Sequence, residues 1–384
     1  MRALVIALIV ASLALACAAC QKSDPWHAGD SGTDSDTDSD TDADSDTDSD
    51  TDTWTTADCP DGWICYPDVT CDNDGDGAPD VGWTWLGVSG WLPGAERHDD
   101  EFTVEDDGVV LDEVTGLRWQ RCTEVQFTDS CLAGYDQEYY VTDLAGLCEE
   151  AHGPGWRVPR VDELATLVDH GESSESGDST AAIAAEAFPN TPCRAYWTAT
   201  RLSYLEGDMT RRAGVHFDTG DIGMVSESDG QGAVRCILDG SDGEAGARFG
   251  VDPASTGEIH DLRTGLIWRR CAEGQEWSGA TCAGDAVEMT VEEADTACTG
   301  GWRLPGIREL FSIANQCFHE PALDPDAFPG APPGLYGESW CWSSTAGFNP
   351  DTPLRWVASM QTGGTGAREV ETFDNGFVRC VRDP

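Results

Sequence analysis

Short apolar runs alternate with segments of helical spacing along most of this chain. Residues 109–112 and 259–262 are short runs rich in Val, Ile and Leu, and a turn follows each of them, which predicts two strands. Residues 141–151 and 290–298 predict two helices, with apolar residues at helical spacing in the first. Because strand and helix follow each other in the same order twice, the pattern predicts a folding unit that is repeated.

A second helix is expected after each of two Trp-Arg-x-Pro sequences. Proline cannot donate to a strand ladder and is well placed in the first turn of a helix. Pro159 and Pro305 therefore each mark a corner between a short strand and a helix. The apolar residues on one face of these helices are Leu164, Leu167 and Val168 in the first copy and Leu310, Phe311 and Ile313 in the second.

The two copies share their landmarks in the same order, which defines repeats at residues 101–239 and 247–384. Each contains Thr-Gly-Leu-x-Trp, a cysteine in the first helix, the Trp-Arg-x-Pro corner, Phe-Pro, a Trp-[Ser/Thr] strand and a closing Val-Arg-Cys. The recurring residue types, Trp, Arg, Pro, Cys and Gly, are those that build a scaffold. The expected framework residues are Trp119, Trp156, Arg157, Pro159, Trp197, Trp268, Trp302, Arg303, Pro305 and Trp342.

The recurring arginines have three candidate roles. Arg157 and Arg303 can stack on an aromatic ring, pair with a buried carboxylate or contact a ligand. We favour a structural role, with the neighbouring tryptophans as core anchors. The segments between the framework landmarks are the expected contact surfaces, because they are rich in Gly, Asp and aromatic residues. They lie between Pro189 and Trp197, at Tyr204–Asp229, between Phe328 and Trp340, and at Phe348–Phe373.

Residues 1–20 have the pattern of a secretory signal peptide. A basic residue precedes an apolar run from Ala3 to Ala16, and small residues follow. Small residues beside a cysteine also resemble a bacterial lipobox, in which the cysteine becomes the lipidated N-terminus. Cys17 fits the usual lipobox somewhat better, whereas cleavage before Cys20 leaves an even number of further cysteines, and we favour Cys20. The alternative is an ordinary signal peptide and free secretion.

Charge distinguishes the tail from the repeats and excludes several partners. Residues 21–57 are rich in Ser, Thr and Asp and have too few apolar residues to offset the entropy of ordering. We therefore expect a disordered acidic linker that lifts the domains off a membrane. The whole chain has a net charge of −49, and Lys22 is its only lysine. Such a field repels DNA, RNA and heparin-like glycans.

Residues 58–100 form a Cys-rich bridge with a candidate loop for structural calcium. Asp72, Asp74, Asp76 and Asp80 occupy positions 1, 3, 5 and 9 of the loop, with glycine at position 6. Ca²⁺ prefers such carboxylate oxygens on a tight turn. The segment resembles the calcium loops of thrombospondin type-3 and EF-hand-like repeats. Position 12 is tryptophan rather than the bidentate glutamate of an EF-hand, and a polar turn without metal is the alternative.

Sixteen cysteines favour a disulfide framework over metal sites, because no Cys-x-x-Cys pair occurs in the repeats and the histidines are scattered. The expected disulfides are Cys122–Cys131, Cys148–Cys236, Cys271–Cys282, Cys298–Cys380 and Cys317–Cys341. Cys193 is then odd in the first repeat, as is one of Cys59, Cys65 and Cys71 in the bridge. Parity favours a disulfide from the bridge to Cys193, although connectivity does not follow from sequence.

The combined motifs resemble the Lcl C-terminal domain family, formerly a domain of unknown function, over both repeats. The resemblance implies an extracellular binding or adhesion module. The order of elements is also similar to C-type-lectin-like folds, in which a helix cysteine pairs with the last strand. We therefore expect an α+β fold class, with two tandem disulfide-stapled C-type-lectin-like domains after the disordered acidic linker.

The expected function is that of a lipid-anchored protein of a bacterial cell envelope that binds an extracellular glycan or protein and no nucleic acid. A structural envelope protein that self-assembles without a soluble ligand is the alternative. Formylglycine-generating enzymes share a C-type-lectin-like core and use a cysteine pair, which is the enzyme alternative. We expect no enzyme, because the chain lacks a nucleophile elbow, a phosphate loop and a His-Glu-x-x-His motif.

Overall fold

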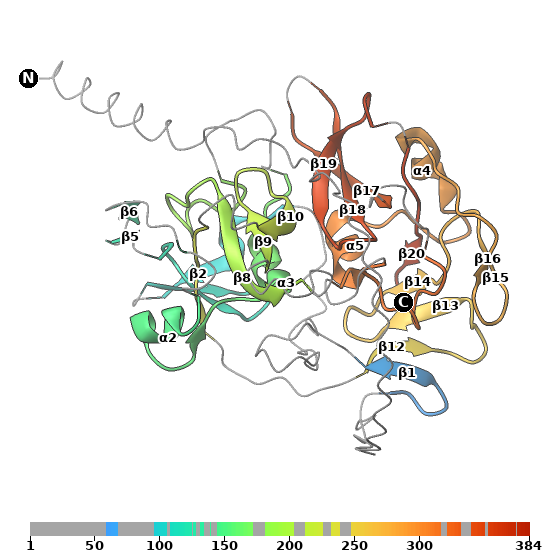
Figure 1. Cartoon of the computed structure of the whole chain (residues 1–384), viewed down its shortest axis with the longest axis horizontal. Helices are drawn as coiled ribbons and strands as arrows, with labels where there is room; N and C mark the ends of the chain where they lie inside the picture. The colour runs from blue at the N-terminus through green and yellow to red at the C-terminus, as the bar shows by residue number, and fades with distance from the viewer. Residues whose placement is uncertain are drawn as a thin grey trace, which may run out of the picture.

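The structure is a computed structural model, and it describes most of both repeats and a small part of the bridge (Figure 1). The described residues are 59–67, 96–105, 108–124, 126–127, 131–133, 139, 144–171, 181–202, 212–225, 232–238, 247–315, 321–331, 339–349, 352–373 and 375–384. The predicted signal peptide, lipidation cysteines, linker and calcium loop lie outside them. No helix in this described part is both long and apolar enough to cross a lipid bilayer.

Each repeat begins and ends in one antiparallel sheet. The strand order is β2-β3-β4-β11-β7 in the first repeat and β12-β13-β14-β20 in the second, where β1 of the bridge is added beside β12. The first sheet consists of β2 (Phe102–Val104), β3 (Val109–Asp112), β4 (Arg118–Gln120), β11 (Ile237–Leu238) and β7 (Trp156–Arg157). The second consists of β1 (Ile64–Pro67), β12 (Ala247–Val251), β13 (Glu258–Asp261), β14 (Ile267–Arg269) and β20 (Val381–Arg382). The two ends of each repeat therefore lie close together.

A six-stranded sheet joins the two repeats, in the order β17-β18-β19-β10-β9-β8. Its strands are β8 (Ala195–Arg201), β9 (Arg212–His216), β10 (Ile222–Val225), β17 (Trp340–Gly347), β18 (Leu354–Ser359) and β19 (Thr365–Glu369). The joint is the antiparallel pairing of β10 with β19 at Ile222 and Thr365, where the backbone N–H of Ile222 also donates to Thr365 Oγ1 (3.2 Å). Three strands from each repeat thus form one continuous sheet.

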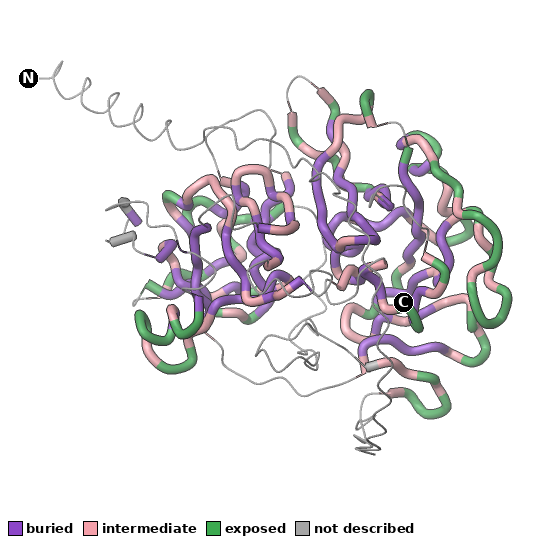
Figure 2. The backbone as a smooth tube through the Cα atoms, viewed as in Figure 1, coloured by how far each residue is buried: buried purple, intermediate pink, exposed green. Residues whose placement is uncertain are grey.

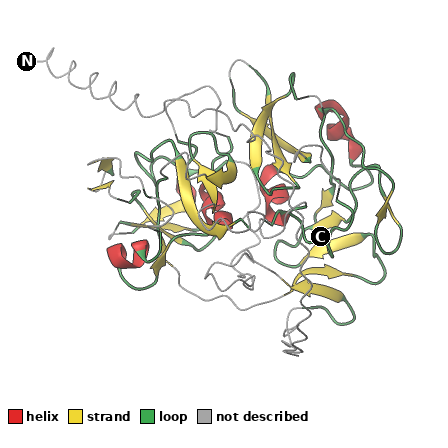
Figure 3. Ribbon diagram, in the orientation of Figure 1, coloured by secondary structure: helices red, strands yellow, loops and turns green. Residues whose placement is uncertain are grey.

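The helices are short and the architecture is mostly sheet (Figure 3). They are α2 (Leu147–His152), α3 (Val161–Leu164), α4 (Val291–Ala297) and α5 (Ile307–Ile313), with 3-10 turns at Asp99–Glu101 and Ala165–Leu167. Two small hairpins, β5 (Gln126–Phe127) with β6 (Leu132–Ala133) and β15 (Glu276–Trp277) with β16 (Cys282–Ala283), complete the described elements. All four predicted helices have counterparts, although α2 is shorter than the pattern suggests.

The recurring Thr-Gly-Leu sequence forms a tight turn between two strands. Its glycine, Gly116 in the first repeat and Gly265 in the second, has φ of 75° in both, a left-handed conformation that other residues rarely adopt. The carboxylate of Asp112 accepts hydrogen bonds from two backbone N–H groups of the first turn, and that of Asp261 does the same in the second. The turn therefore requires this glycine and this aspartate for local reasons.

Buried backbone runs through the inside of both repeats (Figure 2). Four tryptophans of the recurring motifs belong to the core clusters there. They are Trp119, Trp197, Trp268 and Trp342, each fully buried. The indole N–H groups of Trp197 and Trp342 each donate to a backbone carbonyl of an earlier segment, at 2.6 and 2.7 Å. The chain before the last strand passes close to both rings: a Cβ at Gly232 would approach Trp197 to 2.7 Å, and one at Gly376 would approach Trp342 to 3.0 Å. These four framework predictions are confirmed as core positions.

Two segments that the sequence assigns to contact loops contain strands instead. Tyr204–Asp229 includes β9 and β10, and Phe348–Phe373 includes β18 and β19. The prediction is wrong because these strands build the joint between the repeats, where most of their residues are buried. Their glycines suggest loops, yet they permit close packing of the sheet: a Cβ at Gly214 would lie 2.1 Å from the Val225 side chain.

Candidate functional site

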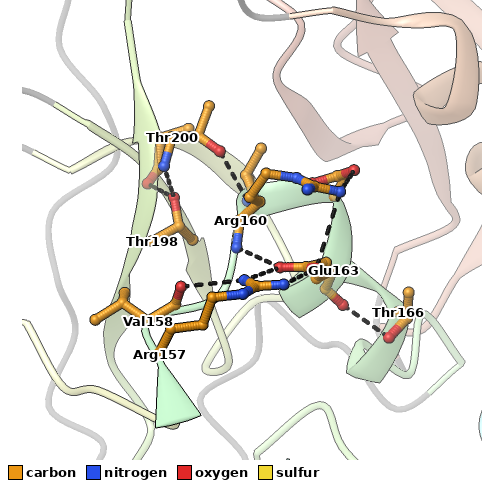
Figure 4. Close-up of polar contacts among 10 residues, drawn as sticks. Arg157, Val158, Arg160, Glu163, Thr166, Thr198 and Thr200 are labelled. Atoms are coloured by element: carbon orange, nitrogen blue, oxygen red, sulfur yellow. Dashed lines mark hydrogen bonds and ion pairs between the residues drawn. The ribbon is translucent and has the colours of Figure 1, made fainter. Parts of the chain in front are cut away.

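The duplicated Trp-Arg-x-Pro-x-x-x-Glu-Leu sequence folds into a corner that an ion pair holds together (Figure 4). Arg157 on β7 donates both terminal nitrogens to the carboxylate of Glu163 on α3, with Nη1–Oε2 at 2.8 Å and Nη2–Oε1 at 2.6 Å. The backbone N–H of Arg160 donates to the same carboxylate at 2.7 Å, which caps the start of the helix. Glu163 is only 1% exposed. Its carboxylate is therefore a structural part of the corner.

Two guanidinium groups determine the ionisation of Glu163. Burial by itself raises the pKa of Glu163, but the charges of Arg160 and Arg157 and the hydrogen bonds that they donate outweigh it and hold the pKa at about 2. Arg160 in turn pairs with Asp162, with Nε–Oδ1 at 3.1 Å. Glu163 is thus ionised at neutral pH with its acceptors occupied, a state that does not suit a general base.

The second repeat builds the same corner. Arg303 donates to both carboxylate oxygens of Glu309 at 2.7 Å, and the backbone N–H of Gly306 donates to Glu309 at 2.7 Å. Arg303 also donates to Asp383 at 2.8 Å, so this arginine lies nearer the surface. The hydrogen bond to Glu309 raises the pKa of Arg303 further above its usual value. Of the roles considered for the two arginines, the described structure shows pairing with a buried carboxylate.

The Trp-[Ser/Thr]-x-Thr sequence fastens the same helices to the central sheet. Thr200 Oγ1 accepts from the backbone N–H of Val161 at 3.0 Å, at the start of α3. Thr345 Oγ1 accepts from the N–H of Ile307 at 3.0 Å, at the start of α5. The preceding hydroxyl of each motif, on Thr198 or Ser343, donates to a carbonyl of the neighbouring strand. These recurring hydroxyl groups therefore make their hydrogen bonds within the scaffold.

The tryptophans of the two corners differ from the other four. Trp156 and Trp302 are half-buried and pack against the outside of the core clusters, so they contribute to the cores but are less central than the prediction of core anchors implied. The guanidinium carbons of Arg269 and Arg382 both lie over the Trp302 ring, at 5.0 and 4.9 Å from its centroid. Trp156 packs on the ring of His152 at 5.1 Å.

Four of the predicted disulfides are present in the structure. They are Cys122–Cys131, Cys148–Cys236, Cys271–Cys282 and Cys298–Cys380. Within the bridge, Cys59 is bonded to Cys65. Cys193 is also in a disulfide, which is none of these five. Cys71 is the bridge cysteine left for it, and that link stays a prediction.

The predicted Cys317–Cys341 disulfide is wrong. Cys341 on β17 carries a free thiol and is buried, while Cys317 lies outside the described residues. Burial raises the pKa of Cys341 to about 11, although the nearby charge of Arg379 acts in the opposite direction. Cys341 occupies the place of Tyr196 in the first repeat, so it follows the core pattern of the strand rather than cysteine pairing.

A buried arginine in each closing Val-Arg-Cys is a site residue that sequence reasoning missed. Arg235 is fully buried and donates to the carbonyls of Gln120 (2.8 Å) and Arg121 (2.5 Å) and to the hydroxyl of Thr191 (2.8 Å). Arg379 donates to the equivalent carbonyls in the second repeat, and each arginine lies over a buried phenylalanine ring. Burial lowers the pKa of both arginines. The arginine recurs at matching positions of the two repeats, and this recurrence is the sequence signal that could have identified it.

Two other groups of side chains approach a metal-binding geometry. They are Glu124, His152 and Cys236, and Glu273, Cys298 and Cys380, with ligand atoms within 4.8 Å of one another. The cysteine sulfurs are in disulfides and offer no thiolate, which is the form that binds metal. The carboxylates have protein partners, since Glu124 pairs with His152 and Glu273 with Arg269. These two groups of side chains are therefore better explained as packing around the Cys148–Cys236 and Cys298–Cys380 disulfides than as metal centres.

Comparison with known proteins identifies one family. The model of the Lcl C-terminal domain matches residues 108–238 and again residues 257–382. No curated protein and no solved structure matches the chain significantly. Each matched range lies within a repeat, and each repeat contributes to its sheet one strand that precedes the match, β2 or β12.

Proposed function

Since the chain belongs to the Lcl C-terminal domain family over both repeats, we propose that it is an extracellular binding or adhesion module of a bacterial cell surface. The observation that carries this proposal is how the repeated polar groups are used. Glu163, Glu309 and their arginines are paired with each other, and the recurring threonines hold helices to the sheet. Recognition then falls to surface side chains outside these paired groups, including positions at which the two repeats carry different residues.

The candidate contact surface in the second repeat is built around the β15–β16 hairpin. The Cys271–Cys282 disulfide closes this hairpin, and Gln275 Nε2 donates to the carbonyl of Gly330 in the turn after Phe-Pro (3.0 Å). Trp277 is half-buried on the hairpin, with the guanidinium carbon of Arg270 at 4.2 Å from its ring centroid. Arg270 is itself buried and donates to backbone carbonyls, so the exposed part of the Trp277 ring is the group that suits contact with a sugar or a peptide side chain.

The finer parts of the proposal concern fold type and anchoring. We place the repeats among the C-type-lectin-like folds, because a disulfide joins the first helix to the end of each repeat and the terminal strands pair in one sheet. Lipidation at Cys20 and an acidic linker over residues 21–57 would hold the domains on the envelope, away from the membrane. Structural Ca²⁺ at Asp72–Asp80 remains part of the same proposal.

A glycan array probed with the full chain, with and without Ca²⁺, tests the binding function. We expect retention on a limited set of neutral or cationic glycans, and loss of that binding in Trp277→Ala. Trp302→Ala is the matched control, because it removes a half-buried indole from the corner instead of the hairpin. Absence of binding to the array and to protein baits, together with stable self-association, would favour the structural envelope protein.

The enzyme alternative receives less support from cysteine chemistry. Formylglycine-type catalysis needs reactive thiols, whereas the recurring cysteines of the described residues are in disulfides. The free thiol of Cys341 is buried and its pKa is about 11, the reverse of an activated nucleophile.

A further inference from the structure

The two terminal sheets differ at one edge. In the second repeat, β1 of the bridge pairs with β12 along its outer edge, with Ile64 opposite Val251 and Tyr66 opposite Phe249. The equivalent strand of the first repeat is β2, since Phe102 pairs with Asp112 as Phe249 pairs with Asp261. Among the described residues, no strand lies on the outer edge of β2. The first repeat therefore presents the position that β1 fills in the second.

Backbone geometry shows which groups of β2 face outward. The carbonyl of Glu101 accepts from Glu113 N–H (2.9 Å), and the N–H of Glu105 donates to the carbonyl of Val109 (2.8 Å), so both residues bond toward β3. Antiparallel ladders alternate in direction, so Thr103 also bonds toward β3 and Val104 bonds outward. The outward N–H of Phe102 is used by the carbonyl of Asp99. The N–H and C=O of Val104 and the C=O of Phe102 remain for an added strand.

The side chains of this edge are exposed. Thr103 and Val104 are exposed, and Val104 is one of the few large apolar side chains that the described residues leave in solvent, at 44%. Exposed edge strands pair readily with other chains unless they are blunted or covered. The outer edge of β1 ends in Pro67, and bridges to Ala233 and Phe377 cover part of β8 and β17. The edge of β2 carries no such protection among the described residues.

Carboxylates surround this edge. Asp100 is exposed, and Asp99, Glu101 and Glu105 are half-buried beside β2, whereas the exposed Glu113 lies on the β3 side and accepts from the Thr103 hydroxyl. The nearby arginines are already engaged: Arg97 binds Glu101 and Asp112, and Arg118 pairs with Glu105 (3.4 Å). A second copy of this edge would bring like charges together, which is unfavourable. A cationic strand would be attracted to it.

We propose that the outer edge of β2 is a docking site for an extended, lysine- or arginine-bearing segment of a partner protein, which adds to the sheet as β1 adds to β12. The backbone of Val104 supplies a pair of ladder hydrogen bonds and the flanking carboxylates select a basic partner. This site does not depend on the ligand proposed for the hairpin surface.

A fluorescein-labelled peptide of alternating lysine and valine, added to the full chain, tests the proposal by anisotropy. Binding should weaken with added salt, and it should fall about tenfold or more when alternate peptide nitrogens are methylated, since ladder hydrogen bonds are lost. A peptide of alternating glutamate and valine should not bind. Equal binding of the acidic or the methylated peptide would overturn the proposal.

Two variants of one residue separate backbone pairing from side-chain contact. Val104→Pro removes the outward N–H and should weaken binding about tenfold, whereas Val104→Thr keeps it and should bind within about twofold of the parent chain. Amide exchange supplies a measurement that does not depend on a variant: the basic peptide should slow exchange at Val104 and leave Thr103, which already bonds to β3, unchanged. A Val104 amide already protected in the free chain, with no peptide binding, would mean that the edge is filled by the chain itself and would refute the proposal.

Discussion

At the scale of residues, arginine occupies several of the buried polar positions of both repeats. Arg235 and Arg379 are almost completely buried and are held by carbonyl groups and an aromatic ring, without a carboxylate partner among the described residues. A planar guanidinium with several fixed donors can satisfy converging carbonyls, which an ammonium group does less well. The same preference appears in the Arg157–Glu163 pair. Buried charges of this kind are costly to leave unpaired.

Removing the carboxylate of Glu163 should show this cost. Glu163→Gln keeps the shape of the side chain but leaves Arg157 and Arg160 without their buried counter-charge. We expect the free energy of unfolding to fall by about 3–5 kcal/mol in chemical denaturation. Glu309→Gln should lose less, because Arg303 is 40% exposed and also binds Asp383. The exposed Glu149→Gln is the control, and a change as large there would contradict the assignment.

The same carboxylate makes stability depend on pH. Glu163 has a pKa of about 2 in the folded chain, below the value near 4.3 expected when unfolded. A carboxyl group whose pKa is lower in the folded chain than in the unfolded chain stabilises the fold fully above the unfolded pKa. That stabilisation is lost as the pH falls through about 4 toward 2. Denaturation midpoints measured between pH 6 and 2 should therefore fall less steeply in Glu163→Gln than in the parent chain. Parallel curves would show that Glu163 does not contribute this term.

The free thiol of Cys341 should be inert in the native chain. Burial raises its pKa to about 11, so the thiol is protonated at neutral pH and also shielded from reagents. A thiol-specific disulfide reagent should label it at neutral pH only after a denaturant is added, which absorbance measurements can follow. Fast labelling of Cys341 in the native chain, located by peptide mapping, would contradict this and would reopen the enzyme alternative.

At the scale of elements, a disulfide holds the first helix of each repeat, and capping contacts hold the start of the second helix. The disulfide from α2 to the end of the first repeat spans 88 residues, whereas Cys122–Cys131 spans 9. The helices α3 and α5 are only a few residues long and would not persist alone in water. The capping carboxylates of Glu163 and Glu309 and the hydroxyls of Thr200 and Thr345 fix their starts. The positions of α3 and α5 thus depend on these capping contacts more than on helix propensity.

Disulfide removal should reflect loop length. In the chain-entropy model, replacing Cys148 and Cys236 by alanine lowers the free energy of unfolding by about 4–5 kcal/mol, and replacing Cys122 and Cys131 by about 2–3 kcal/mol. Urea denaturation of the two double variants, with the parent chain alongside, measures the difference. Equal losses would indicate that strain or residual structure, rather than loop closure, controls these bonds.

At the scale of the whole molecule, the repeats are joined through packing as well as through the central sheet. Trp356 of the second repeat donates its indole N–H to the carbonyl of His170 of the first (3.2 Å), with ring centroids 4.7 Å apart. Arg308 donates to the carbonyl of Val168 (2.8 Å), and Phe311 belongs to the core cluster of the first repeat. α5 therefore contributes to both halves. These contacts hold the two repeats in a fixed geometry relative to each other.

This joint should make unfolding cooperative across the chain. We expect a single calorimetric transition for the two repeats and a loss of about 3–5 kcal/mol for Trp356→Ala, by removal of a large buried side chain. Amide exchange should then accelerate in β9 of the first repeat as well as in β18. Phe348→Ala, at a 52% exposed position, is the control. Two independent transitions, or acceleration confined to β18, would contradict the shared core.

The sequence by itself determined the duplication, the family motifs and the tight Thr-Gly-Leu turns, and it predicted the four helices and four of the disulfides. These features depend on local spacing and on residue types with narrow conformational preferences, so they are legible along one chain. Only the tertiary structure decided that Arg157 and Arg303 pair with the motif glutamates, that Cys341 stays reduced, and that the expected loops at β9–β10 and β18–β19 form the joint between repeats. Contacts between residues far apart in sequence carry no local signature, because a strand that pairs with another repeat has the same glycines and small residues as a loop. The open edge of β2 likewise becomes visible only beside its counterpart, where β1 is already in place.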